Sequence, residues 1–220
     1  MIRPRQFDLI AFDWDGTLFD STTLIVRCIQ SACADLDLPV PSNRDASYVI
    51  GLGLGEALEQ VVPALSRERY AELGNRFRRH FLAGQHEIVL FDGVVAMLQT
   101  LKARNHWLAV ATGKSRRGLD EALETVVLRG LFDGSRTADE TASKPSPQML
   151  LELMREFGVD PSRTLMIGDT THDLEMARNA GTASVGVSYG AHEPATFEAY
   201  QTLHVAHSVA DLHAWLIAHG

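Results

Sequence analysis

The sequence predicts an α/β protein: a Rossmann-like parallel sheet with helices on both faces, and a small all-helical cap inserted after the first strand. From residue 92 onward, short apolar runs alternate with helical patterns, as is typical of a parallel sheet covered on both faces. A further apolar run lies at residues 9–12, and residues 21–84 contain helical patterns without a convincing strand. We therefore expect a core built from residues 1–20 and 85–220 and a helical cap domain at residues 21–84.

Local patterns predict the first strand and the cap. Residues 8–12 are predicted to form a short buried strand, because an apolar run at 9–12 is stopped by a turn-forming Asp-Gly pair. Thr22–Leu36 places its apolar residues on one helical face, and Glu56–Val62 and Glu68–Leu82 have helical patterns as well. These predicted helices make up the cap.

Strands and helices alternate through the rest of the chain. Apolar residues at 94–101 form one helical face, which predicts a helix there. Arg117–Leu128 is predicted to be a helix as well. Asp173–Ala180 is a further helix, which ends at Gly181. The predicted strands of this part are Trp107–Ala111, Gly134–Thr137, Thr164–Ile167, Ala183–Val187 and His204–Ala206.

Two helices have a start signal in the sequence. Ser146-Pro147 supplies a capping side chain followed by proline at the first helical position, and the helix that it opens stops at Gly158. Ser208 with Asp211 resembles a capping box. We therefore expect one helix to begin beside Ser146 and the last helix to begin beside Ser208.

Composition and charge narrow the class of protein. The chain has 220 residues with 45% hydrophobic content, which suits one α/β domain with an insertion and no stabilising cross-links. Its formal net charge is −8 without a basic stripe, which argues against a general nucleic-acid binder. The apolar run near the N-terminus is too short for a signal sequence or a membrane span, so a cytoplasmic protein is expected. Cys28 and Cys33 are predicted to be buried thiols in a reducing compartment.

Polar side chains follow the predicted strands, at the edge where a parallel sheet carries its chemistry. Asp13 and Asp15 follow the first strand, and Asp169 and Asp173 follow a later one. The other polar residues expected at this edge are Thr112, Gly113 and Lys114, after Trp107–Ala111, and Lys144, in the loop before the helix at Pro147. We expect these residues to form one site.

In order along the chain, these residues resemble the four motifs of the haloacid dehalogenase superfamily. Asp13-Trp14-Asp15-Gly16-Thr17 resembles the DxDGT motif, and Gly168-Asp169-Thr170-Thr171-His172-Asp173 resembles GDxxxD. Between them, Thr112-Gly113 and Lys144-Pro145 are similar to the second and third motifs. The insertion after the first motif looks like the helical cap of the phosphoglycolate-phosphatase-like branch, and the resemblance spans almost the whole chain.

The resemblance implies a magnesium site. Asp13, Asp169 and the backbone carbonyl of Asp15 would supply the oxygen ligands that Mg²⁺ prefers. Asp173 would act at the same site by orienting a metal-bound water or Lys144. Mg²⁺ is therefore the expected cofactor.

The resemblance also implies a phosphoryl-transfer mechanism. Lys144, the Thr112 hydroxyl and the Gly113 N–H would bind the phosphoryl oxygens. Asp13 would attack phosphorus and form an aspartyl-phosphate. Asp15 would protonate the leaving oxygen and later take a proton from the attacking water. Two residues apart on an extended strand, both carboxylates share a face and reach one phosphoryl group.

Asp15 narrows the implied chemistry. Dehalogenases of the superfamily lack this second aspartate, and the phosphonate-cleaving members resemble DxAGT, so its presence favours phosphate esters. The P-type ATPases share the first motif but are membrane proteins. The implied function is a Mg²⁺-dependent phosphatase for a small phosphomonoester, with phosphoglycolate as the first candidate.

Other functions stay open at this point. A sugar phosphomutase, similar to beta-phosphoglucomutase, would use the same first half-reaction, and the cap would decide between the two by excluding water. Inorganic pyrophosphatase activity is another alternative. A non-catalytic phosphate-binding regulatory module is disfavoured, because no nucleophile, lysine or metal ligand is missing. The expected partner is a small phosphorylated metabolite, without nucleic acid or membrane, and the expected state is a monomer or homodimer.

Several further residues have a structural interpretation. His172 occupies a variable motif position and is expected to be a structural or rim histidine. Gly51-Leu52-Gly53-Leu54-Gly55 misses the G-x-G-x-x-G pattern, so we expect a cap loop that faces the site. The Trp14 side chain is expected to point into packing. Arg76, Arg78, Arg79 and His80 could contact the substrate, but a solvated helix face is favoured for them. Arg116 and Arg117 could lie at the mouth of the cleft, and a solvated helix face is favoured for them as well.

Overall fold

The predicted parallel sheet is present in the computed structural model, which describes residues 6–124 and 128–220. Within these residues the sheet has six strands in the order β5-β4-β1-β6-β7-β8, and each neighbouring pair is parallel. The strands are β1 (Leu9–Phe12), β4 (Trp107–Thr112), β5 (Gly134–Thr137), β6 (Thr164–Gly168), β7 (Ala183–Val187) and β8 (Val205–Ala206).

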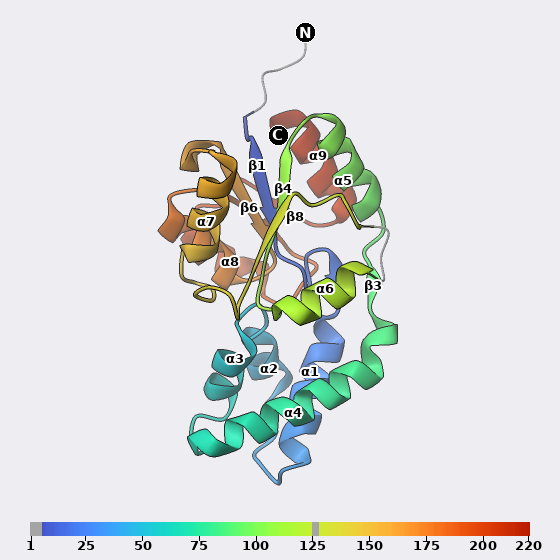
Figure 1. Cartoon of the computed structure of the whole chain (residues 1–220), viewed down its shortest axis with the longest axis vertical. Coiled ribbons are helices and arrows are strands. Elements are labelled where there is room, and N and C mark those ends of the chain that lie inside the picture. Colours follow the sequence, from blue (N-terminus) through green and yellow to red (C-terminus); the bar gives the residue numbers. More distant parts are fainter. Residues whose placement is uncertain (1–5, 125–127) are drawn as a thin grey trace.

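Helices cover both faces of this sheet, as predicted. Figure 1 shows α7 and α8 on one side of the sheet and α5 and α9 on the other. Among the described helices, none combines the length and the apolar character that a membrane crossing requires. The helices of this part are α5 (Val94–Ala103), α6 (Arg116–Glu124), α7 (Gln148–Phe157), α8 (Thr171–Ala180) and α9 (Val209–His219), with the short 3-10 helices η2 (Pro161–Arg163) and η3 (Pro194–Tyr200).

The side chains of β1 alternate between two buried clusters. Leu9 and Ala11 pack with residues of α7 and α8, whereas Ile10 and Phe12 pack with residues of α5 and α9. Trp14 joins the second cluster, where its ring stacks on Phe19 at 4.7 Å between centroids. The alternation explains why this strand is apolar at every position, and it confirms that Trp14 points into packing.

The register of the central strands sets the position of the polar residues. Phe12, the last residue of β1, is level with Val110 of β4 and with Ile167 of β6. The carboxyl ends of the three strands therefore meet at one edge of the sheet. In Figure 1 this edge faces the group of helices α1–α4.

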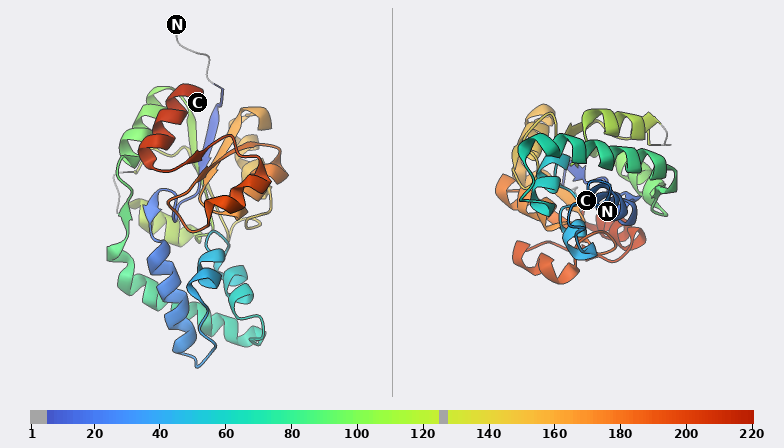
Figure 2. Two further views of the ribbon diagram at one scale, coloured as in Figure 1. Left: turned by 180° about the vertical axis from the view of Figure 1, so that it is seen from behind. Right: turned by 90° about the horizontal axis from the view of Figure 1, so that it is seen from below.

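Helices α1–α4 pack against one another below the sheet. They bury apolar clusters of their own, which include Ile29, Leu58 and Leu73. Cys28 and Cys33 of α1 are free, buried thiols, as predicted. Seen from below, this group of helices lies in front of the sheet (Figure 2). Its elements are α1 (Thr22–Ala34), α2 (Asn43–Tyr48), α3 (Leu54–Val61) and α4 (Arg67–Gly84), followed by the 3-10 helix η1 (Gln85–Glu87).

The two chain segments that connect α1–α4 to the sheet pair with each other. β2 (Phe19–Asp20) and β3 (Val89–Leu90) form an antiparallel pair, with Phe19 opposite Leu90. The sequence did not predict this pair, because two-residue strands separated by a whole group of helices leave no local pattern.

Two helices differ from the sequence prediction, one because it was not predicted and one because its described part is shorter. α2 was not predicted: it has six mostly polar residues and begins where the Ser42 hydroxyl accepts the Asp45 N–H, at 3.1 Å. Such a short helix has no periodic apolar face. The predicted helix Arg117–Leu128 corresponds to α6, which ends at Glu124; residues 125–127 of that prediction lie outside the described residues.

Both predicted helix starts are confirmed, and only the capping box of α9 is incomplete. α7 begins at Gln148, directly after Ser146-Pro147, and Ser146 Oγ accepts the Gln148 N–H at 3.4 Å, so the capping side chain is the predicted one. At α9, Ser208 Oγ accepts the Asp211 N–H, as predicted. The Asp211 carboxylate, however, accepts the N–H of His207, so this end is only half of a capping box.

Candidate active site

Three aspartates meet at the edge of the sheet that faces α1–α4. Asp13 directly follows β1, Asp169 directly follows β6, and Asp173 lies in the first turn of α8. One carboxylate oxygen from each lies within 4.8 Å of the others, and all three side chains are buried. The structure therefore brings together the acidic residues that the sequence placed after separate strands.

Lys144 lies inside this acidic cluster. Its Nζ is 2.5 Å from Asp13 Oδ1 and 2.6 Å from Asp173 Oδ1, and the side chain is completely buried. Burial alone would lower the pKa of Lys144, but the charges of Asp13 and Asp173 overcome it and hold the pKa above its ordinary value. Lys144 is therefore a fixed positive charge.

Asp173 is held in place by the start of α8. Its Oδ2 accepts the Thr170 N–H at 3.1 Å and the Thr170 hydroxyl at 2.7 Å, and Thr170 Oγ1 in turn accepts the Asp173 N–H. This is a complete capping box. One carboxylate thus closes the helix end with one oxygen and pairs with Lys144 through the other.

The cluster carries more negative than positive charge. Burial raises the pKa of Asp169 to about 7, and the nearby Asp173 adds to the rise. Burial also raises the pKa of Asp13 well above its ordinary value, against the effect of Lys144. Among the described residues, Asp13 Oδ2 has no hydrogen-bond partner. A buried carboxylate oxygen without a partner, next to a second carboxylate, fits a bound divalent cation with oxygen ligands.

Asp15 has partners different from those of Asp13. Its Oδ1 accepts the Ser21 hydroxyl at 2.8 Å, and its Oδ2 is 3.0 Å from Lys114 Nζ. The sequence placed Lys114 at this edge without giving it a role, and it missed Ser21, which lies in the connection to α1. The general position of Lys114 was predictable from its place after β4, but its pairing with Asp15 was not.

Thr112 and Gly113 lie at the end of β4, beneath a loop from the helical group. A Cβ atom at position 113 would lie 2.3 Å from the Leu52 carbonyl oxygen and 2.7 Å from that of Gly51, so only glycine fits. The Gly53 N–H donates to Ser143 Oγ at 2.8 Å, next to Lys144 in the chain. The loop at residues 51–53 therefore covers the site, as expected from the sequence.

Comparison with known proteins agrees with this arrangement. The profile of the haloacid dehalogenase-like hydrolase family matches residues 10–187. The chain belongs to this family. It is 38% identical over 189 residues to a protein of Dickeya dadantii named "Probable phosphatase IndB", covering 84% of this chain and 82% of that protein. It is 33% identical over 195 residues to a phosphoglycolate phosphatase of Mannheimia succiniciproducens, covering 84% and 87% of the two chains.

A solved structure confirms the fold of this haloacid dehalogenase-like hydrolase. The crystal structure of a hydrolase from Pseudomonas syringae superimposes with a TM-score of 0.87 at 25% sequence identity. The match covers 95% of this chain and 97% of the other. The helices α1–α4 and the sheet are thus both part of the shared architecture.

His172, inside the fourth motif of this hydrolase, makes a contact with α2. Its Nε2 is 2.7 Å from the Tyr48 carbonyl oxygen, and His192 Nε2 is 3.0 Å from the same oxygen. His192 Nδ1 accepts the Thr171 N–H at 3.0 Å, so its Nε2 carries the proton that it donates to Tyr48. Burial lowers the pKa of His172 and lowers that of His192 to about 4. The structural role expected for His172 is confirmed.

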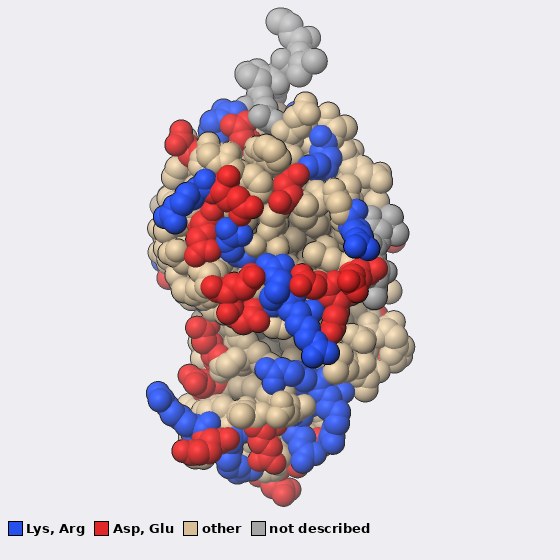
Figure 3. Space-filling view, viewed as in Figure 1, with Lys and Arg blue, Asp and Glu red and all other residues tan. Residues whose placement is uncertain are grey.

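The arginines of α4 and α6 are largely engaged away from the aspartate cluster. On the face drawn in Figure 3, Lys and Arg side chains gather where α1–α4 meet the rest of the molecule. Asp35, at the end of α1, pairs with three residues of α4: Arg79 at 2.8 Å, His80 at 3.0 Å and Arg76 at 4.0 Å. Arg117 pairs with Glu121 on its own helix. These contacts agree with the solvated helix faces favoured from the sequence.

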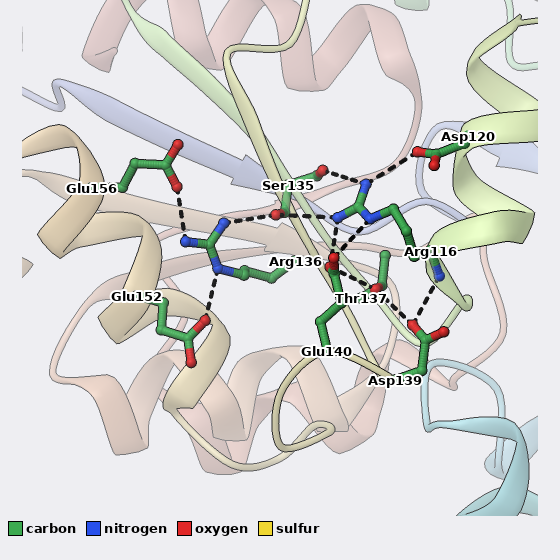
Figure 4. A network of polar contacts seen from close by, with 9 residues as sticks. All are labelled: Arg116, Asp120, Ser135, Arg136, Thr137, Asp139, Glu140, Glu152 and Glu156. Carbon is green, nitrogen blue, oxygen red and sulfur yellow. Dashed lines mark hydrogen bonds and ion pairs between the residues drawn. The ribbon is translucent and has the colours of Figure 1, made fainter.

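Arg116 belongs to a polar network around β5, drawn in Figure 4. Its guanidinium pairs with Glu140 at 2.6 Å, and its backbone N–H donates to Asp139 Oδ1 at 2.8 Å. The same guanidinium lowers the pKa of Glu140 to about 2. The Thr137 hydroxyl lies 2.8 Å from a carboxylate oxygen of each acidic side chain and donates its one proton between them. The network fixes the start of the loop that carries Lys144, so Arg116 supports this loop from the outside.

Proposed function

We propose that this hydrolase is a Mg²⁺-dependent phosphatase that acts on a small phosphomonoester through an aspartyl-phosphate on Asp13. The observation that carries the proposal is the buried cluster of Asp13, Asp169 and Asp173 around Lys144. We also propose that residues 21–84 act as a cap over this cluster. The name of the Mannheimia succiniciproducens relative supports phosphoglycolate as the first substrate to test.

The acidic residues would hold the metal ion. Asp13 and Asp169 would be ligands through their carboxylates, and Asp15 through its backbone carbonyl. Bound Mg²⁺ neutralises the charge on the phosphoryl oxygens and on the attacking carboxylate. Asp173 would keep Lys144 in place, because its own position is fixed by the capping box of α8.

In the first half-reaction, an Asp13 carboxylate oxygen attacks phosphorus while the bond from phosphorus to the leaving oxygen breaks. Asp15 donates its proton to that leaving oxygen, so the product is a neutral alcohol. Lys144, the Thr112 hydroxyl and the Gly113 N–H stabilise the phosphoryl oxygens. No covalent change is required of these last three groups.

In the second half-reaction, Asp15 takes a proton from a water molecule that attacks the phosphorus of the aspartyl-phosphate. The bond from phosphorus to Asp13 breaks, inorganic phosphate leaves, and Asp13 is restored. The loop at residues 51–53 lies over Gly113, so the cap has to open for substrate entry and phosphate release. The cytoplasmic location and the monomeric or dimeric state expected from the sequence stay predictions.

The test is release of inorganic phosphate from a panel of small phosphate esters with and without Mg²⁺. We expect Mg²⁺-dependent hydrolysis that is lost, by about 100-fold or more, in Asp13→Asn. The matched control is Asp20→Asn, an exposed aspartate of β2, which keeps wild-type turnover. Release from pyrophosphate alone, or conversion of a hexose phosphate to its isomer without phosphate release, contradicts the proposal. Those results would instead identify a pyrophosphatase or a phosphomutase.

A further inference from the structure

Lys114 is a second ammonium group beside the aspartate cluster, and it is partly buried. Its Nζ is 3.0 Å from Asp15 Oδ2, and its side chain is only 13% exposed. The ammonium also lies 4.9 Å from the centre of the Phe81 ring on α4. Lys114 therefore bridges the end of β4 and the helical group at the position of Asp15.

The backbone of Lys114 is fixed on both sides. Its N–H donates to Thr112 Oγ1 at 3.2 Å, and its carbonyl accepts the Ala138 N–H at 3.0 Å. Because these bonds tie the residue to β4 and to the segment after β5, the side chain extends from a rigid base. A charge held in this way is preorganised for recognition.

Lys114 and Lys144 differ in how their charges are balanced. Lys144 is in contact with two carboxylates, Asp13 and Asp173. In the part of the chain that the structure describes, Lys114 has one carboxylate partner, Asp15, and an aromatic ring on another side. Its ammonium group has three N–H donors, so it retains the capacity to bind a further anion.

The proposed mechanism places the leaving group next to this ammonium. Asp15 donates its proton to the leaving oxygen, so that oxygen lies within hydrogen-bond distance of Asp15 when substrate is bound. Lys114 contacts the same carboxyl group. If the proton comes from Asp15 Oδ2, the leaving oxygen is no more than about 6 Å from Nζ, the sum of two hydrogen-bond lengths. If it comes from Oδ1, the limit is about 8 Å, because the two oxygens of a carboxyl group are roughly 2 Å apart.

We propose that Lys114, under the Phe81 ring, is the leaving-group-binding residue of this hydrolase and selects phosphomonoesters whose alcohol carries an acid group close to the ester oxygen. This inference rests on the proposed function. A carboxylate one or two carbons from the ester oxygen falls within reach of Nζ, whereas an uncharged alcohol gains nothing there. Phe81 comes from α4, so this recognition requires the closed position of the helices.

Other cations near the site are less suited to this role. Asp35 engages Arg76, Arg79 and His80 of α4. Arg78 donates to the neutral Asn75 Oδ1 at 3.2 Å, and its side chain is exposed. Arg78 is therefore the alternative that the experiment has to separate from Lys114.

The test compares two substrates of the same skeleton, 2-phosphoglycolate and ethyl phosphate, which differ in the carboxylate. We expect the wild-type protein to prefer 2-phosphoglycolate in kcat/KM. In Lys114→Met, the ratio of the two kcat/KM values falls by about 10- to 100-fold, as expected for loss of one charge-assisted hydrogen bond. Lys114→Arg keeps the charge and has an intermediate ratio.

Two variants control for nonspecific effects of removing a cation. Arg117→Met removes an exposed cation of α6 and leaves the ratio unchanged. Arg78→Gln also leaves it unchanged; a fall in this variant, with none in Lys114→Met, overturns the proposal in favour of Arg78. If Lys114→Met is too slow to assay, the same ratio is taken from thermal stabilisation by each phosphate ester in an Asp13→Asn background.

The outcomes separate this inference from the proposed function. If the wild-type protein releases phosphate from neither compound nor from any other ester of the panel, the proposed function fails. If it hydrolyses phosphate esters but Lys114→Met leaves the ratio unchanged, only the role of Lys114 fails. In that case Lys114 serves to balance the charge of Asp15.

Discussion

Asp13 and Asp15 lie two positions apart, yet their carboxylates have different surroundings. Asp13 is buried beside Lys144, Asp169 and Asp173, and one of its oxygens has no partner among the described residues. Asp15 is held by Ser21 and Lys114. An oxygen without a hydrogen-bond partner suits a nucleophile or metal ligand, whereas a carboxyl group held at a fixed orientation suits proton transfer.

At the residue scale, Asp169 predicts how metal binding depends on pH. Its pKa is raised to about 7 from an ordinary value of 3.8, so in the ion-free protein it loses its proton only near neutral pH. A carboxyl group with a raised pKa favours the folded state at low pH, and that contribution is lost as the pH rises toward 7. Mg²⁺ needs the ionised form, so its binding is opposed by the proton below that pH.

We therefore expect Mg²⁺ to raise the melting temperature more at about pH 8 than at about pH 5. The measurement is thermal unfolding of the wild-type protein with and without the ion at both values. Asp169→Asn removes the proposed ligand and is expected to abolish the Mg²⁺ effect at either pH. An equal effect of Mg²⁺ at both pH values contradicts the assignment of Asp169 as a ligand.

At the element scale, the end of β4 and the loop at residues 51–53 fit each other only because position 113 is glycine. The Leu52 carbonyl oxygen would lie 2.3 Å from a Cβ atom at that position. The clash is with backbone, so a side chain at 113 would displace the loop. The substitution should therefore affect the activity of the site and not the stability of the sheet.

Gly113→Ala is expected to lower kcat/KM by about 10-fold or more, because the loop could not close over the groups proposed to bind the phosphoryl oxygens. The measurement is steady-state hydrolysis of the best substrate, together with the melting temperature. The matched control is Gly55→Ala in α3, where a Cβ atom would meet nothing within 4 Å. That change leaves kcat/KM intact and raises stability by up to about 1 kcal/mol. Equal kinetic effects of the two substitutions contradict this account.

At the same scale, the sequence predicts the central elements well and the short ones poorly. β1, β4 and β6 have apolar runs buried on both faces, so their positions were evident. α2 has only six residues, and β2 pairs with β3 across the whole helical group, so neither left a local pattern. The strand ends also predicted which polar residues would gather at one edge.

Which site residues contact one another could not be predicted from the sequence. Asp173 was expected to orient Lys144 or a water molecule, and the structure has its carboxylate in contact with Lys144. The contact of Lys114 with Phe81 depends on how α4 lies against the end of β4, and its contact with Asp15 joins the segments that follow β4 and β1. Such contacts join residues far apart in the chain, and no periodicity or motif reports them.

At the scale of the whole molecule, α1–α4 meet the rest of the protein through a few polar contacts around the site. Tyr48 receives hydrogen bonds from His172 and His192, and the Gly53 N–H donates to Ser143. The Tyr48 ring also stacks on His192, at 5.2 Å between centroids. These contacts hold α2 and the loop after it against the end of the sheet.

His172→Ala is expected to loosen this contact without unfolding the core. Loss of one buried hydrogen bond speeds amide hydrogen exchange in residues 43–53 by about 10-fold, while the amides of β1 keep their protection. The control is His207→Ala, which removes a side-chain contact with Ser188 just after β8 and β7. Unchanged exchange in residues 43–53 contradicts the role given to the histidine contact.

The most direct test of the central claim is whether a phosphoryl group is attached to Asp13 during turnover. In Asp15→Asn, the second half-reaction lacks its base, and an aryl phosphate supplies a leaving group that needs no proton. We expect rapid acid quenching followed by mass spectrometry of peptides to find one phosphoryl group on Asp13, and none in Asp13→Asn. Release of phosphate without a modified Asp13, or a phosphoryl group on another residue, would contradict the mechanism.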